Sequence, residues 1–199
     1  MTRINRDYYI ENDTLWLARD LLGKYLYCHS DEYGLSGGII TETEAYLGAN
    51  DRASHAYGNR RTRRTETMFK TGGIAYIYLC YGIHHLFNIV TAAEDIPHAV
   101  LVRGMLPIAG SKNMERRTGR KVPFLLDGPG KLTRAMGVTT RLNGTALDQD
   151  TIWLEDKRIQ VPDAIISATP RIGVGYAGED AKLLYRFVLD DKPFLLQLA

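Results

Sequence analysis

Residues 75–91, AYIYLCYGIHHLFNIVT, decide the fold more than any other part of the 199-residue chain. Aromatic and β-branched residues fill both ends of this stretch, which predicts two antiparallel strands, 75–80 and 86–91. Tyr81 and Gly82 fall between them and are typical of a hairpin tip. A side chain at such a tip is directed outward, so we expect Tyr81 to protrude.

Strand patterns continue on both sides of this hairpin, and helical patterns are few. The other predicted strands are 25–28, 38–46, 99–106, 152–154, 164–167 and 185–198, and the predicted helices are 13–23, 111–117 and 131–136. Because the strands outnumber the helices without regular alternation, the expected fold class is α+β, with a mainly antiparallel curved β-sheet, flanking short helices and a protruding β-hairpin. No linker or repeat divides the chain, so residues 1–199 are expected to form a single domain.

The composition excludes several classes of protein. Hydrophobic residues make up 45% of the chain and charged residues 24%, close to the average of globular domains, which argues against disorder, collagen and coiled coil. No apolar run approaches the roughly 20 residues of a membrane span, and the N-terminus lacks an apolar signal core. We therefore expect a cytoplasmic monomer with no membrane association or obligate protein partner, in which Cys28 and Cys80 are reduced.

Positive charge is concentrated in two short clusters, residues 60–70 and 112–121. Each cluster carries a net charge of +4, whereas the whole chain carries only +2, so the remainder carries −6. Such a polarity is expected where one face of a protein meets a polyanion. Two solvated loops would produce the same pattern, so the clusters alone leave both interpretations open.

Two carboxylates in residues 40–46, ITETEAY, are candidates for acid–base chemistry. Strand alternation directs Ile40, Glu42, Glu44 and Tyr46 to one face, with the carboxylates about 7 Å apart. A carboxylate in a partly apolar pocket can accept a proton from water or stabilise a developing positive charge. An edge strand that carries acidic residues for solubility is the alternative interpretation.

The hairpin contains more tyrosines than a core strand needs. Each buried hydroxyl among Tyr76, Tyr78 and Tyr81 would have to find a hydrogen-bond partner. An exposed aromatic ring at a hairpin tip is suited to act as a wedge between stacked bases. A purely structural hairpin with tyrosines at its rim is the alternative.

No convincing motif for a metal or a cofactor is present in the sequence. The five histidines are scattered, and no zinc-type spacing occurs. Residues 173–178, GVGYAG, match a dinucleotide-binding fingerprint, but Glu179 and Asp180 follow where a helix N-terminus would have to accept a pyrophosphate. We therefore expect no cofactor and no metal.

A series of motifs resembles the alkyladenine (3-methyladenine) DNA glycosylase family. The motifs are ETEAYLG at 42–48, ASH at 53–55, MF at 68–69, YxYxxYG at 76–82, Asn88, LVR at 101–103, DGPGKL at 127–132 and RIGVG at 171–175. Their joint order is far more specific than any one of them. The resemblance implies a monofunctional glycosylase that flips alkylated or deaminated purines out of double-stranded DNA and hydrolyses the N-glycosidic bond, leaving an abasic site.

The resemblance also implies roles for individual residues in the reaction. Glu44 would be the general base that activates the attacking water, and Arg103 and the backbone carbonyl of Ile172 would hold that water. Tyr81 would enter the duplex and fill the gap left by the flipped nucleotide, restoring stacking that extrusion removes.

Further residues are implied in the base pocket and at the DNA. Tyr46, His55 and Tyr78 would form the pocket by stacking and hydrogen bonding, and Asn88 would exclude guanine by crowding its exocyclic amino group. The expected DNA contacts are Gly82, Ile83, Gly128, Gly130, Lys131, Arg60, Arg61 and Arg63.

Two other functions stay open at the level of the sequence. A non-catalytic protein that binds damaged DNA would also insert Tyr81 between bases, but its pocket would not cleave the N-glycosidic bond. A hydrolase of sugars or free nucleosides would use Glu42 and Glu44 together, although it would have no use for Tyr81 or for the basic clusters.

Overall fold

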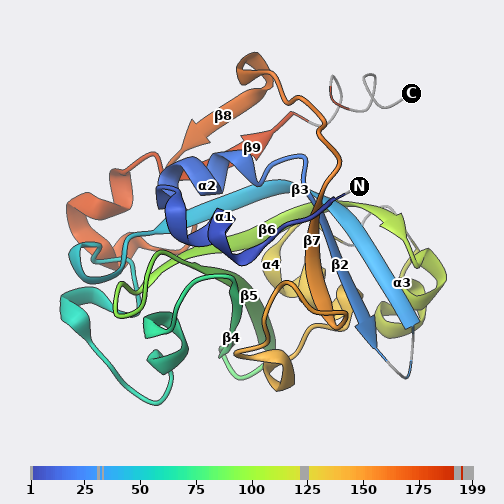
Figure 1. The fold of residues 1–199 in the computed structure, drawn as a ribbon, viewed down its shortest axis with the longest axis horizontal. Helices are drawn as coiled ribbons and strands as arrows, with labels where there is room; N and C mark the ends of the chain where they lie inside the picture. The colour runs from blue at the N-terminus through green and yellow to red at the C-terminus, as the bar shows by residue number, and fades with distance from the viewer. Residues whose placement is uncertain (1, 31, 33, 122–125, 191–193, 195–199) are drawn as a thin grey trace.

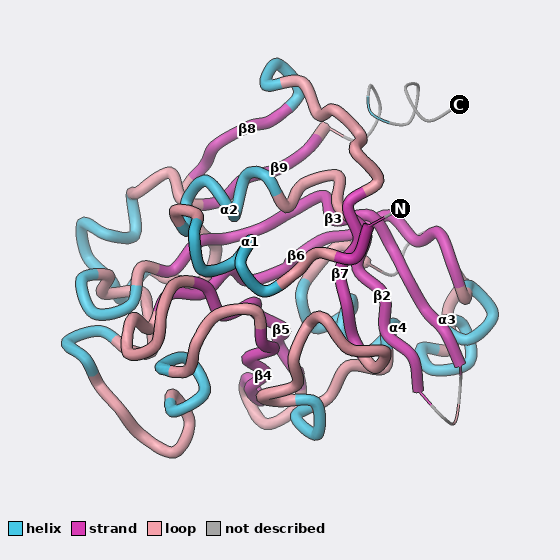
Figure 2. Tube along the Cα trace, viewed as in Figure 1, coloured by secondary structure: helices cyan, strands magenta, loops and turns pink. Residues whose placement is uncertain are grey.

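The computed structural model describes residues 2–30, 32, 34–121, 126–190 and 194. Within these ranges, nine antiparallel strands form one curled sheet in the order β1-β7-β2-β3-β6-β5-β4, with β9 on the free part of the β3 edge and β8 beyond it (Figures 1 and 2). The strands are β1 Thr2–Arg3, β2 Tyr25–Ser30, β3 Gly34–Tyr46, β4 Ile74–Cys80, β5 His84–Thr91, β6 His98–Ala109, β7 Ile152–Asp156, β8 Ile166–Thr169 and β9 Arg186–Leu189.

The helices are short, and the α+β fold class is confirmed. The α-helices are α1 Arg6–Glu11, α2 Thr14–Asp20, α3 Ser111–Thr118 and α4 Pro129–Met136. The 3₁₀ helices are Gly48–Asn50, Tyr57–Asn59, Glu66–Phe69, Thr140–Leu142, Asp163–Ile165 and Gly175–Lys182. Among the described residues, no helix has the length and apolar character needed to cross a bilayer.

Local sequence signals explain where these helices begin and end. The Asp13 carboxylate caps α2 by accepting hydrogen bonds from two backbone N–H groups of its first turn. Pro129 stands in the first turn of α4, and Gly137 ends that helix with a left-handed φ of 74°. The same signals predicted α2, α3 and α4, whereas α1 was not predicted.

The strands agree with the predicted ones in the first two thirds of the chain and differ toward the C-terminus. The predicted strand 164–167 is a 3₁₀ turn followed by β8, which starts at Ile166. The predicted strand 185–198 is β9 over Arg186–Leu189, and its residues 191–193 and 195–198 lie outside the described ranges.

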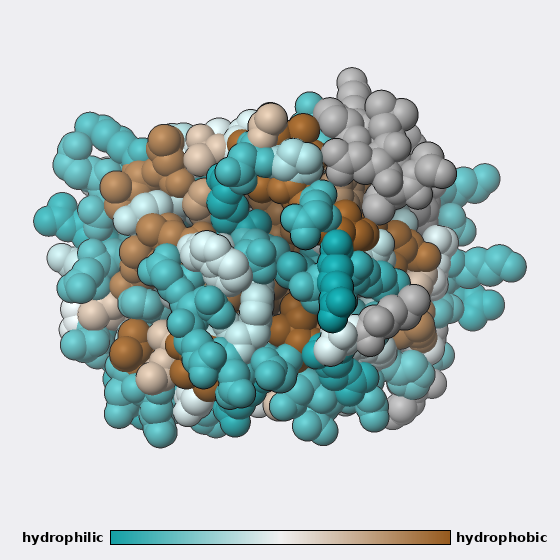
Figure 3. All heavy atoms as spheres, turned by 45° about the horizontal axis from the view of Figure 1, so that its top comes forward, coloured by the Kyte–Doolittle hydropathy of each residue, from teal (hydrophilic) through white to brown (hydrophobic). Residues whose placement is uncertain are grey.

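The main core lies between the sheet and its helices. α2 packs against β3 and β6, and α4 packs against β5 and β6. Leu17 and Leu21, together with Phe87, Val102 and Leu154 of the sheet, are fully buried. On the face drawn in Figure 3, hydrophilic side chains predominate, with small apolar patches between them.

The prediction that Ile40 shares a face with Glu42, Glu44 and Tyr46 is wrong. The register between β3 and β6 shifts on both sides of Glu42. A bulge adds a residue to one strand and interrupts strict alternation. Ile40 therefore packs in the main core with Ala45, while Glu44 and Tyr46 face the other side of the strand.

Candidate active site

Glu44 is a completely buried carboxylate with both oxygens engaged. Its Oε1 accepts a hydrogen bond from the backbone N–H of Ile172 at 2.7 Å, and its Oε2 accepts one from the Tyr46 hydroxyl at 2.7 Å. Burial raises the pKa of Glu44 above its usual range, against the opposing effects of Arg103 and of these two hydrogen bonds. The carboxylate is thus held in one orientation inside the protein.

Arg103 links the two carboxylates of β3. It lies at the bulge of β6, and its Nε is 2.7 Å from Glu42 Oε1 and 3.4 Å from Glu44 Oε1. Glu42 also accepts a hydrogen bond from Arg186 Nε of β9 at 2.6 Å. Since Glu42 is neutralised by two guanidinium groups, Glu44 is the better placed of the two to accept a proton.

A buried ion pair that the sequence did not predict anchors Ile172 beside Glu44. Arg171 donates to Asp51 through both terminal nitrogens, with Nη2 at 2.8 Å from Oδ1, and its Nη1 also donates to the Ala45 carbonyl at 2.8 Å. Its guanidinium lies 4.8 Å from the centre of the Tyr46 ring. Arg171 therefore ties the 171–172 segment to β3 and holds the Ile172 N–H against Glu44.

The contact of Ile172 with Glu44 runs through its N–H group. The Ile172 carbonyl is an acceptor like the carboxylate, and its implied role of holding the attacking water stays a prediction. Arg171 stands in the RIGVG motif, but its carboxylate partner is 120 residues away in the chain. No local pattern could have paired the two residues.

An aromatic group lies next to the buried carboxylate. The rings of His55 and Tyr78 meet edge to face with centroids 4.5 Å apart, and the rings of Tyr76 and Tyr78 are 5.5 Å apart. Burial raises the pKa of the Tyr46 hydroxyl, and neighbouring Glu44 and Tyr78 raise it further, which joins Tyr46 to the group. The structure thus packs His55 against Tyr78 and has Tyr46 close enough to Tyr78 to interact electrostatically, while the pocket role of the three residues stays a prediction.

Asn88 lies on β5 directly opposite Tyr76 of β4 and is buried. Its amide nitrogen donates to the Tyr76 carbonyl at 3.1 Å. This hydrogen bond fixes the amide plane of Asn88 beside the strand that carries the aromatic group.

Tyr81 stands at the hairpin tip, as predicted. Its side chain is 92% exposed, and its φ of 50° is left-handed, as is that of Gly82 at 73°. The Ile83 N–H donates to the Cys80 carbonyl and closes the turn. A positive φ is uncommon for a bulky residue and costs about 1 kcal/mol. The tip therefore displays Tyr81 and the 71% exposed Ile83 to solvent.

The basic residues predicted to contact DNA differ in whether a carboxylate already binds their charge. Arg61 is bound by Glu66 and Asp95 and lies 4.8 Å from the Phe69 ring, so its charge is used within the protein. Lys131 forms an exposed ion pair with Asp127 at 3.0 Å. Arg60 and Arg63 are exposed beside Arg61.

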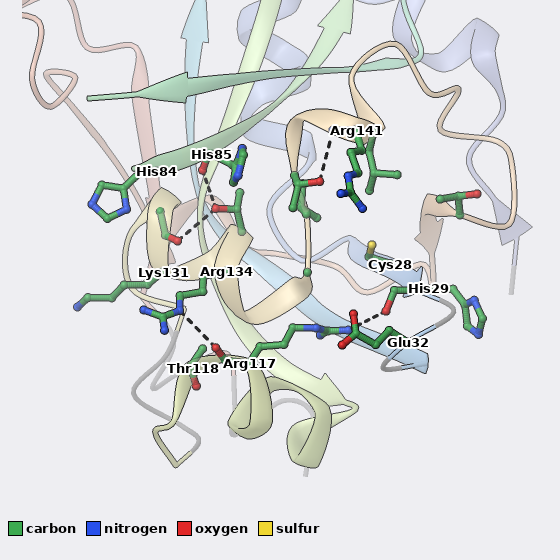
Figure 4. A pocket seen from close by; sticks show the side chains of 18 of the residues that line it. Cys28, His29, Glu32, His84, His85, Arg117, Thr118, Lys131, Arg134 and Arg141 are labelled. Carbon is green, nitrogen blue, oxygen red and sulfur yellow. Dashed lines mark hydrogen bonds between the residues drawn. The ribbon is translucent and has the colours of Figure 1, made fainter. Parts of the chain in front are cut away.

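A basic cavity of about 1240 Å³ lies beside the hairpin (Figure 4), and Glu44 is not among the described residues that line it. Ile83, His84 and His85 of the hairpin line one side, and α4 with Gly130 and Lys131 lines another. A Cβ atom added to Gly130 would come within 2.9 Å of the His84 ring, so glycine permits this close packing. The predicted contacts Ile83, Gly130 and Lys131 therefore lie together, on a surface separate from the aromatic group.

Comparison with known proteins shows which protein family the chain belongs to. The sequence model described as methylpurine-DNA glycosylase (MPG) matches residues 8–193. DNA glycosylases are hydrolases that act on N-glycosyl bonds. The chain belongs to the methylpurine-DNA glycosylase family, and its substrate is damaged DNA.

Three relatives illustrate the similarity, each named "Putative 3-methyladenine DNA glycosylase". The protein of Chlamydia abortus is 44% identical over 188 residues, which cover 93% of this chain and 97% of the relative. The protein of Bacillus cereus is 40% identical over 197 residues, covering 94% and 96%. The protein of Clostridium novyi is 37% identical over 204 residues, covering 98% of each.

Proposed function

We propose that the protein is a monofunctional DNA glycosylase that removes alkylated or deaminated purines, of the 3-methyladenine, 7-methylguanine, hypoxanthine and ethenoadenine class. It flips the purine out of the duplex, hydrolyses the N-glycosidic bond and leaves an abasic site. The observation that carries this proposal is the buried carboxylate of Glu44, held by Ile172 and by Tyr46, whose hydroxyl interacts electrostatically with Tyr78 of the His55–Tyr78 ring pair.

Glu44 supplies the general base of the reaction. The bond from the sugar to the purine nitrogen breaks, the purine leaves with the bonding electrons, and positive charge develops on the sugar. The carboxylate stabilises this charge and accepts a proton from the water whose oxygen bonds to the anomeric carbon. Arg103, 3.4 Å from Glu44, and the Ile172 carbonyl hold this water.

The pocket selects its purine by stacking and by shape. Tyr46, His55 and Tyr78 present aromatic faces that favour electron-poor rings, and an alkylated, cationic purine gains a cation–π attraction as well. Asn88, whose amide donates to the Tyr76 carbonyl, crowds the exocyclic amino group of normal guanine. 7-Methylguanine carries the same amino group, but its positive charge gains the cation–π attraction that normal guanine lacks. Normal purines are disfavoured further because they remain paired and stacked in the duplex.

The DNA lies across the hairpin tip and the basic surface beside it. Gly82 and Ile83 follow Tyr81 at the tip, and Gly128, Gly130 and Lys131 lie at the start of α4. Arg60 and Arg63 supply further phosphate contacts, whereas Arg61 is engaged by two carboxylates. Because these contacts are electrostatic, binding weakens steeply as the salt concentration rises.

Replacing Tyr81 by serine should weaken extrusion of the lesion and spare the chemical step. Serine cannot stack on the bases that border the gap in the duplex. The state with the nucleotide flipped out is therefore destabilised by about 1–3 kcal/mol. Single-turnover base release from a stably paired duplex lesion is expected to fall, while release from a single-stranded or unpaired lesion changes little. Equal loss on both substrates would contradict the wedge.

Base release should fall as the pH drops through the pKa of Glu44. The ionised carboxylate is the form that accepts a proton, and burial raises this pKa above the usual range of a glutamate. The rate is therefore expected to rise with pH, with a midpoint above the usual range of a glutamate, and then to level off. Single-turnover rates measured from acidic to neutral pH test this, and a flat profile would exclude Glu44 as the base.

The overall proposal is tested with duplexes that each carry one lesion, scored for free base by chromatography. We expect release of methylated purine or hypoxanthine and an unbroken strand that breaks only after alkali treatment. A non-catalytic reader would bind these duplexes without releasing base. A nucleoside hydrolase would act on free nucleosides in preference to DNA.

A further inference from the structure

The guanidinium of Arg64 stands where the purine is proposed to bind. Its Cζ lies 4.7 Å from the centre of the Tyr78 ring, and its Nη2 is 3.2 Å from His55 Nε2. Both rings belong to the proposed base pocket. A purine that stacks on Tyr78 and approaches His55 Nε2 needs the space that this guanidinium fills.

The protonation state of His55 follows from its two partners. An arginine can only donate, so His55 Nε2 accepts, and its Nδ1–H donates to the Tyr76 hydroxyl at 2.9 Å. Burial, aided by the positive charges of Arg64 and Arg60, lowers the pKa of His55 to about 4. At neutral pH, His55 is uncharged and points a lone pair at Arg64.

Arg64 is bound loosely compared with its neighbour Arg61. Arg61 forms ion pairs with two carboxylates at 2.7 and 2.9 Å. Within the described part of the chain, none of the ion pairs involves Arg64, whose partners are the neutral rings of the pocket. The side chain is exposed and long, so it can leave the pocket without breaking an ion pair.

We propose that Arg64 is a gate of the base pocket: in the free protein its planar guanidinium occupies the purine position against Tyr78 and His55, and an entering purine displaces it. This proposal rests on the proposed function. The gate adds the same cost to the entry of every purine, and the difference between a normal and a damaged purine comes from the pairing that each must lose in the duplex.

The gate is tested on the full-length protein with free hypoxanthine as the probe, so that neither duplex binding nor catalysis enters the measurement. The variants are Arg64→Met, which removes the guanidinium, and Arg63→Met, which removes the same charge one residue away. Calorimetry or NMR titration is expected to show hypoxanthine binding about fivefold tighter to Arg64→Met than to the wild type, since no cation–π contact must be broken. Arg63→Met should bind as the wild type does.

A second readout reports on Arg64 in the absence of any base. An NMR pH titration of His55 should give a higher pKa in Arg64→Met than in the wild type, with a smaller change in Arg63→Met. Hypoxanthine affinity decides the proposal: equal or weaker binding by Arg64→Met, including no measurable binding by any of the three proteins, overturns the gate. Failure of the proposed function is distinct, because it is seen as absent base release from lesion duplexes by the wild type.

Discussion

Replacing Glu44 by glutamine should lower single-turnover base release at least about 100-fold, the usual scale for a positioned general base. Glutamine has nearly the same shape, and its amide oxygen can still accept a hydrogen bond from Ile172 or Tyr46, so the fold and the DNA affinity should change little. It cannot accept a proton from water. The measurement is the rate of free base release with enzyme in excess, alongside duplex binding.

Glu42→Gln is the matched control for this prediction. Glu42 carries the other carboxylate of the strand, but Arg103 and Arg186 both engage its Oε1. Its loss disturbs Arg103 without removing the base, so the rate should fall much less than in Glu44→Gln. The mechanism would be contradicted if the two variants lost activity equally, or if Glu44→Gln kept most of it.

Asp51→Asn should lower the free energy of unfolding by about 3–5 kcal/mol, the usual cost of breaking a buried ion pair. It leaves the guanidinium of Arg171, whose side chain is completely buried, without its countercharge. It also loosens the segment that holds the Ile172 N–H against Glu44, so base release should fall as well. Urea unfolding at neutral pH measures the first effect.

Asp150→Asn serves as the control for Asp51→Asn. Asp150 pairs with Arg3 at 2.9 Å, but its side chain is 95% exposed, and such pairs contribute less than about 1 kcal/mol. If the buried ion pair anchors the site, the free energy of unfolding should be much lower in Asp51→Asn than in Asp150→Asn. Equal stability of Asp51→Asn and Asp150→Asn would show that the Arg171–Asp51 pair does not support the 171–172 segment.

The predictable parts of the fold are those that depend on the sequence of a few neighbouring residues. The hairpin of β4 and β5 follows from its aromatic and β-branched residues and from Tyr81-Gly82 at its tip. The alternation argument failed at Ile40, because the bulges beside Glu42 depend on how β3 and β6 pair. A register shift has no local sequence signal, since it depends on a strand far away in the chain.

The candidate site was predictable to the extent that its residues share one strand or one motif. Glu44 and Tyr46 are two residues apart, so strand alternation placed them on one face correctly. The pairing of Arg171 with Asp51 and the position of Arg64 over Tyr78 join segments whose proximity only the tertiary fold creates. The net charge of residues 60–70 likewise could not reveal that Arg61 forms ion pairs with Glu66 and Asp95.

The most direct test of the account is a crystal structure of Glu44→Gln bound to a duplex that contains hypoxanthine. We predict the purine rotated out of the duplex between Tyr46 and Tyr78, the Tyr81 ring in the gap, and a water between the residue 44 side chain and the anomeric carbon. A hypoxanthine still stacked in the duplex, or extruded to a place away from residue 44, would contradict it.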